Sequence, residues 1–166
     1  MLKILFLCTG NTCRSPMAEA LFNHDPVHNE LSFQVTASSA GLSAVEGEKA
    51  SIHSRNLLRE EGIEDLDHHS ATSINKEIVD DADLILVMTR DHQKQLLELF
   101  PGLAGKTFTL KEYTAIDYLD PDIGDPLGDN LKKYREVLEE IRACIKKLST
   151  KLMEDKEKQE KGRMNR

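Results

Sequence analysis

Residues 8–16 read CTGNTCRSP, and this stretch decides how the beginning of the chain folds. The apolar run Leu2–Leu7 before it predicts a buried strand, and Pro16 suits the first turn of a helix, where its missing N–H costs no hydrogen bond. A loop between strand and helix directs backbone N–H groups inward and ends at the positive end of the helix, which favours a bound dianion. The stretch therefore predicts a phosphate-binding loop between the first strand and the first helix.

Cys8 and Arg14 are separated by five residues within this loop. An anion-binding loop favours the thiolate form of a cysteine, which is the nucleophilic form, and a guanidinium can hold two phosphate oxygens at once. We predict that Cys8 attacks phosphorus, that Arg14 clamps the phosphate and that Ser15 donates its hydroxyl to the Cys8 thiolate. The alternative, a buried cysteine and an unrelated surface arginine, is the commoner meaning of such a spacing, but Gly10 and Asn11 in the same loop disfavour it.

Length, charge and cysteine content restrict the class of protein. A chain of 166 residues fits one domain with a single core, and a net charge of −7 gives no support for nucleic-acid binding. The N-terminal stretch resembles neither a signal peptide nor a membrane span, so no membrane association is expected. Three cysteines form no disulfide framework, which favours a reducing cytoplasm. The histidines lack metal-ligand spacing, and covalent catalysis needs no metal or other cofactor.

Strand and helix patterns alternate along the chain, which predicts an α/β fold with a parallel sheet, right-handed crossovers and helices on both faces. Almost every residue from Glu154 onward is charged or polar, which predicts a frayed, solvated end. The expected strands are Leu2–Leu7, Phe33–Ala37, Leu84–Met88 and Thr107–Leu110, and the expected helices are about Pro16–Asn23, Ile52–Glu61, Asn75–Asp80, His92–Leu99 and Leu131–Leu152.

A general acid must also face the loop, because the leaving atom needs a proton. The segment 120–128, DPDIGDPLG, offers two candidates, Asp120 and Asp125, each followed by proline. Both Asp-Pro pairs could instead simply form turns, since Asp, Pro and Gly are the usual turn residues.

The loop CTGNTCRSPMAEALF, the later SSAG, the segment DADLILVMTRDHQKQL and an Asp-Pro pair before the last helix resemble the low-molecular-weight protein phosphatases. The resemblance covers residues 2 to about 152, and implies a four-stranded sheet with its active site at the carboxyl ends of the strands. It divides the chain into a phosphatase domain, 1–152, and a charged tail, 153–166. CTGNTCRS and FTLKEY are most similar to the bacterial protein-arginine phosphatases, whereas tyrosine-specific members carry isoleucine at the position of Thr12.

The resemblance also implies roles for individual residues. It favours Asp125 over Asp120 as the acid, and it identifies Asn11 as a brace of the loop, bonded to Ser39 and His68. An ordinary surface position is the alternative for His68. The phosphate-binding residues are expected to be Thr9, Gly10, Asn11, Thr12, Cys13 and Ser15. The resemblance also implies that oxidation can join the two loop cysteines, in which case a Cys8–Cys13 disulfide protects the nucleophile from irreversible over-oxidation.

Three activities are candidates for this loop, and the third is disfavoured. The first is hydrolysis of phosphoarginine in proteins, with Thr12 meeting the guanidino group. The second is hydrolysis of phosphotyrosine, which is the same reaction on a different substrate; if Thr12 only fills space, the enzyme is a broad phosphatase. The third is arsenate reduction, which needs two further downstream cysteines where this chain has only Cys144, expected to be a buried structural thiol. A non-catalytic anion-binding module is disfavoured because nucleophile, clamp and acid are all present. Phosphorylated proteins are the expected partners, and the sequence specifies no oligomeric state.

Overall fold

The computed structural model of the protein describes residues 1–31, 34–116 and 119–164, and it contains the predicted parallel four-stranded sheet. Its strands are β1 (Leu2–Cys8), β2 (Val35–Gly41), β3 (Leu84–Val87) and β4 (Thr107–Thr109), and their spatial order is β2-β1-β3-β4. All pairs are parallel. The four predicted strands are confirmed, although β2 extends to Gly41, and Phe33, at the start of the predicted second strand, lies outside the described residues.

Strand β1 is central and buried on both faces, because each of its faces packs against a separate group of apolar side chains. Ile4 and Phe6 belong to one group, which includes residues of the first and last helices. Leu5 and Leu7 belong to the other, which includes Val79 from the opposite layer of helices. A strand buried on both faces reads as a continuous apolar run rather than an alternating one, which is the pattern of residues 4–7.

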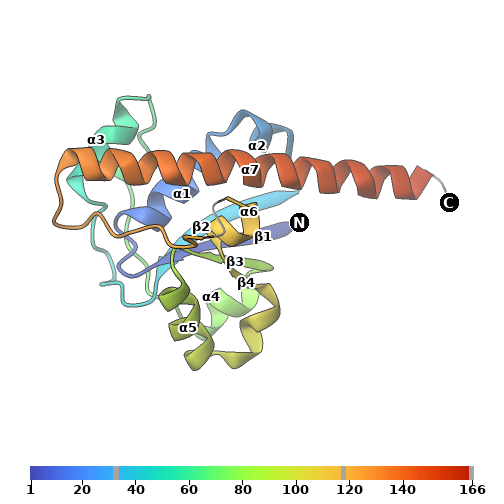
Figure 1. Ribbon diagram of the computed structural model, residues 1–166, viewed down its shortest axis with the longest axis horizontal. Helices are drawn as coiled ribbons and strands as arrows, with labels where there is room; N and C mark the ends of the chain where they lie inside the picture. Colours follow the sequence, from blue (N-terminus) through green and yellow to red (C-terminus); the bar gives the residue numbers. More distant parts are fainter. Residues whose placement is uncertain (32–33, 117–118, 165–166) are drawn as a thin grey trace.

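The helices form a layer on each face of the sheet (Figure 1). Helices α1 (Arg14–Asn23) and α7 (Leu131–Met164) pack on one face, and α4 (Lys76–Asp81) and α5 (Arg90–Leu99) pack on the other. Two short helices, α2 and α6, were not predicted, because six and five residues are too few for a helical period to stand out. The helices are α1 (Arg14–Asn23), α2 (Pro26–Leu31), α3 (Ile52–Arg59), α4 (Lys76–Asp81), α5 (Arg90–Leu99), α6 (Leu110–Thr114) and α7 (Leu131–Met164), with 3₁₀ helices η1 (Asp65–Asp67) and η2 (Pro101–Lys106).

Helix α7 is longer than the sequence predicted. It continues to Met164 and extends beyond the body of the molecule (Figure 1), where a frayed end was expected from Glu154. The extension is rich in Lys, Glu and Gln, which have high helix propensity, and Asp155 pairs with Lys158 one turn away. The polarity of this stretch therefore correctly indicated that it is exposed to solvent, but the prediction that the helix frays from Glu154 was wrong.

The carboxyl ends of the central strands meet at one edge of the sheet, where ligands of open α/β sheets bind. Cys8 is the last residue of β1 and pairs with Gly41, the last residue of β2. Val87, which ends β3, pairs with Thr109, which ends β4. The loop after β1 therefore lies at this edge. Among the helices of the described residues, none is long and apolar enough to cross a membrane.

Candidate active site

The loop between β1 and α1 encloses a small cavity of about 90 Å³ at the carboxyl edge of the sheet. Cys8 is buried, and its Sγ lies 2.9 Å from Ser15 Oγ. This contact supports the expectation that the serine hydroxyl bonds to the thiol. The cavity is lined by Cys8, Thr9, Gly10, Thr12, Cys13, Arg14, Asp125 and Leu127.

Asn11 braces the loop from behind. It is fully buried and has a φ of +55°, a left-handed conformation that asparagine tolerates better than most residues. Its Nδ2 donates to Ser15 Oγ at 2.9 Å and to Ser39 Oγ at 3.0 Å, while its Oδ1 accepts from the Thr72 N–H at 2.9 Å. Both polar atoms of the side-chain amide are therefore used, in three hydrogen bonds that hold the loop in shape.

Ser39 bonds to Asn11 as the resemblance implied, but the histidine of this network is His69 rather than His68. His69 Nε2 lies 2.6 Å from the Asn11 carbonyl oxygen, whereas His68 is exposed. The 3₁₀ helix η1 ends at Asp67, and His68 is its C-cap residue and is exposed. The next residue, His69, is the one that reaches Asn11. Ser39 also donates to Glu19 at 2.5 Å, and burial raises the pKa of that carboxyl.

Arg14 and Asp125 both line the cavity and form an ion pair, with Nη2 and Oδ2 3.4 Å apart. Arg14 is buried and donates through Nη1 to the Ile123 carbonyl at 2.9 Å, which fixes the direction of its guanidinium. Asp120 instead accepts from the Asp122 N–H at 3.1 Å, within its own exposed turn. Of the two Asp-Pro pairs, the one at Asp125 therefore reaches the cavity.

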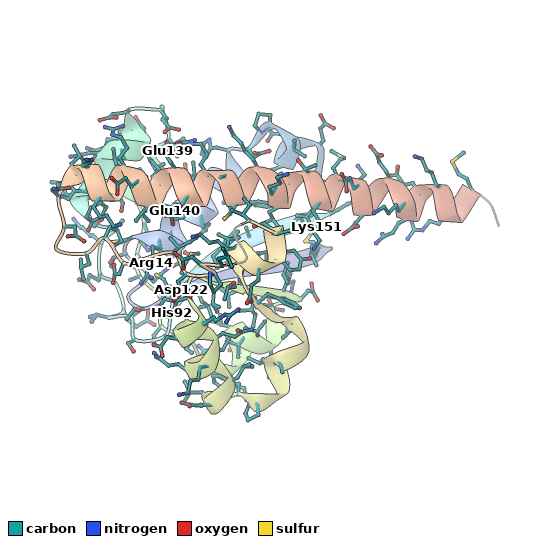
Figure 2. All side chains as sticks on the ribbon, in the orientation of Figure 1. Arg14, His92, Asp122, Glu139, Glu140 and Lys151 are labelled. Carbon is teal, nitrogen blue, oxygen red and sulfur yellow. The ribbon has the colours of Figure 1, made fainter. Side chains whose placement is uncertain are left out.

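A buried histidine lies beside the loop, and sequence reasoning did not identify it. His92, in the first turn of α5, places Nε2 2.8 Å from Thr9 Oγ1. Burial, reinforced by the positive charge of Arg14, lowers its pKa to about 4, so the imidazole is neutral near pH 7. Figure 2 shows His92 and Arg14 in the same region as Asp122, whose charge also acts on the imidazole.

The second loop cysteine contacts the last helix. Cys13 Sγ lies 3.6 Å from the Tyr134 hydroxyl, and burial together with this contact raises the pKa of Tyr134 to about 12. The third cysteine, Cys144, is fully buried in α7, and burial raises its pKa, which fits the structural role expected of it. Cys144 does not line the cavity of the two loop cysteines.

Gly41, the last residue of the SSAG motif, is needed for the loop to approach β2. A Cβ atom at this position would lie 2.6 Å from the Thr9 carbonyl oxygen and 3.0 Å from the Asn11 backbone nitrogen. The sequence indicates this requirement only by placing a glycine in the SSAG motif. It does not reveal that the backbone of Thr9 and Asn11 comes close to that glycine.

Taken together, the arrangement can bind a tetrahedral dianion over a thiol. The loop amides and the Arg14 guanidinium supply hydrogen-bond donors, and the Asp125 carboxyl at the mouth can exchange a proton with a leaving atom. The predicted residues Thr9, Gly10, Thr12 and Cys13 line the cavity with them, while Asn11 and Ser15 support it from outside.

Several known proteins are similar to this chain in sequence and in fold. Residues 3–159 match the family model described as low molecular weight phosphotyrosine protein phosphatase. A protein-arginine-phosphatase of Geobacillus stearothermophilus is 41% identical over 150 residues, which cover 90% of this chain and 95% of that protein. A low molecular weight protein-tyrosine-phosphatase of Acinetobacter johnsonii is 38% identical over 143 residues, covering 86% and 92% of the two chains.

A solved structure shows the same likeness in three dimensions. It is a mutant of the YwlE arginine phosphatase with a phosphorylated active-site serine, and it matches this chain with a TM-score of 0.84 at 34% identity. The match covers 93% of this chain and 97% of that one.

Proposed function

This chain belongs to the family of low molecular weight phosphotyrosine protein phosphatases, and we propose that it hydrolyses phosphorylated protein side chains through a cysteinyl-phosphate intermediate, with phosphoarginine as its favoured substrate. The observation that carries the mechanism is the shared cavity of Cys8, Arg14 and Asp125, which holds nucleophile, clamp and acid within one small volume. The phosphorylated active-site serine of the YwlE mutant supports a covalent phosphoenzyme.

In the first step the Cys8 thiolate attacks phosphorus, forming an S–P bond as the N–P bond of phosphoarginine breaks. Asp125 gives its proton to the departing nitrogen, so that arginine leaves as a guanidino group rather than as an anion. Arg14 and the loop amides bind the three phosphoryl oxygens, whose charge they stabilise through the transition state. The Ser15 hydroxyl, whose oxygen lies 2.9 Å from the Cys8 sulfur, stabilises the thiolate of the free enzyme.

In the second step water attacks the phosphorus of the cysteinyl-phosphate. Asp125, now ionised, takes a proton from that water, and the S–P bond breaks to return the thiolate and release phosphate.

The preference for phosphoarginine rests on the cavity wall beyond phosphorus. Thr12 is half-buried there, and Leu127 is exposed at the mouth. The guanidino group is planar and polar, so a hydroxyl-bearing side chain can satisfy it, whereas an isoleucine would leave hydrogen bonds unmade at about 1–3 kcal/mol. The 41% identity to a protein-arginine-phosphatase supports the same preference. The identity to a protein-tyrosine-phosphatase keeps phosphotyrosine as the second candidate.

Turnover of matched phosphoarginine and phosphotyrosine peptides by the purified enzyme tests the proposal. We expect a higher kcat/KM for phosphoarginine and no measurable turnover of either substrate by Cys8→Ser. Thr12→Ile should shift the ratio of the two kcat/KM values toward phosphotyrosine by roughly ten- to a hundredfold. Substantial activity of Cys8→Ser would contradict the mechanism, and a wild-type preference for phosphotyrosine would contradict the substrate assignment.

A further inference from the structure

His92 is a buried side chain that the proposed mechanism does not use. It is anchored at both ends: its backbone N–H donates to the Thr89 hydroxyl that caps α5, and its Nε2 contacts Thr9 Oγ1 at 2.8 Å. Only 4% of the residue is exposed. The imidazole of His92 is therefore held against Thr9, the residue that follows the nucleophile. It can set the direction of the Thr9 hydroxyl, which belongs to the lining of the cavity.

The second ring nitrogen indicates which tautomer is present. Nδ1 is buried and has no hydrogen-bond partner among the described residues. Buried N–H groups without an acceptor are rarer than buried acceptors without a donor, so the proton belongs on Nε2. Nε2 therefore donates to Thr9 Oγ1. This donation uses one lone pair of the hydroxyl oxygen and leaves the other lone pair, as well as the hydroxyl proton, for a ligand.

The free lone pair belongs to a residue that lines the same cavity as the proposed acid, so it is available to a leaving group bound there. Thr9 is exposed and lines the cavity together with Asp125, the proposed acid of the leaving nitrogen. The charged groups that act on the imidazole are Arg14, Asp91, Asp122 and Asp125. Because burial and Arg14 keep His92 neutral, the imidazole adds no positive charge to repel a guanidinium.

We propose that Thr9 is a specificity-determining residue whose hydroxyl, oriented by His92, accepts a hydrogen bond from the guanidino group of phosphoarginine. The inference rests on the proposed function and deepens it. A guanidino group carries only N–H donors and so needs acceptors around it. The phenolic ring of phosphotyrosine offers no donor at the corresponding position, so the contact discriminates between the two substrates. Thr9 contacts the substrate, and His92 is a positioning residue that acts through it.

The test is the ratio of kcat/KM for phosphoarginine to kcat/KM for phosphotyrosine peptides, measured on the full-length enzyme. Thr9→Val keeps the branched shape but removes the hydroxyl, and should lower this ratio by about tenfold or more, since a hydrogen bond to a charged group is lost. His92→Leu should lower the ratio similarly. His92→Gln, whose amide N–H can replace Nε2–H, should restore most of it. Combining Thr9→Val with His92→Leu should lower the ratio no further than either change alone, because both remove one interaction.

Matched controls separate this inference from the proposed function. Thr36→Val, on the exposed side of β2, and His68→Gln, at an exposed position, should leave the ratio as in the wild type. If the wild type does not prefer phosphoarginine, the proposed function fails. If it does, but Thr9→Val leaves the ratio unchanged, only the role of Thr9 is refuted. Additive effects of Thr9→Val and His92→Leu, or no recovery in His92→Gln, would overturn the positioning role of His92.

Discussion

Gly41→Ala should distort the phosphate-binding loop although residue 41 touches no substrate. The added Cβ would lie 2.6 Å from the Thr9 carbonyl oxygen, where ordinary contacts begin near 3.4 Å, so about 0.8 Å of movement is needed. Two of its three near neighbours are backbone atoms, the Thr9 oxygen and the Asn11 nitrogen, which cannot rotate away as a side chain can. Thr9 is also held by the Ser43 N–H at 2.9 Å, which opposes the movement.

The expected cost has two parts. Overpacking of a well-packed site destabilises a protein by about 1–3 kcal/mol. Displacement of catalytic groups by about 1 Å can lower the rate roughly a hundredfold, because the loop amides no longer meet the phosphoryl oxygens. Chemical denaturation measures the first part. The second is measured by kcat/KM on a small phosphate ester, at a temperature where the variant is still folded.

Two further variants make the test specific. Gly105→Ala, at a position with no atom within 4 Å of the added carbon, should change neither stability nor rate appreciably. Adding Ala44→Gly to Gly41→Ala removes only the side-chain contact at 2.9 Å and should restore little activity. A folded Gly41→Ala enzyme with kcat/KM within twofold of the wild type would refute the argument that Gly41 is required by the loop.

Other changes test the acid, the buried histidine and the second cysteine. Asp125→Asn should lower kcat about 10²–10⁴-fold, whereas Asp120→Asn, confined to its own turn, should be near wild type; the reverse order would move the acid role to Asp120. Between about pH 4 and pH 6.5 the folded protein binds fewer protons at His92 than the unfolded chain does. The contribution of the neutral imidazole to the free energy of unfolding is therefore fully present above pH 6.5 and is lost as the pH falls toward 4. Between pH 7 and pH 5 the free energy of unfolding should therefore fall by about 2 kcal/mol more in the wild type than in His92→Gln, and parallel pH curves would contradict this. Mild peroxide should inactivate the enzyme reversibly through a Cys8–Cys13 disulfide visible by peptide mapping, and finding sulfinic acid at Cys8 with Cys13 free would end that proposal.

Much of the fold and the centre of the candidate site could be predicted from short stretches of sequence, because their physical causes are local. An apolar run buried on both faces, a loop with glycine and asparagine, and a proline in the next turn specify strand, phosphate loop and helix within residues 2–23. The roles of Cys8 and Arg14 could be predicted from the same stretch, because both residues belong to the loop and their separation is set by its length. The alternation of strand and helix then required a parallel sheet, whose carboxyl edge collects the loop.

Tertiary structure decided whatever depends on contacts between distant segments. Asp120 and Asp125 have the same local chemistry, and only the path of residues 119–130 shows that the second reaches Arg14. His68 and His69 differ by one position, and only the end of η1 shows which of them turns inward. His92 contacts Thr9 across 83 positions of sequence, and Gly41 is required by a backbone that approaches from another strand. Such contacts leave no periodic or compositional trace, because each depends on a single pair of atoms brought together by the packing of the whole sheet.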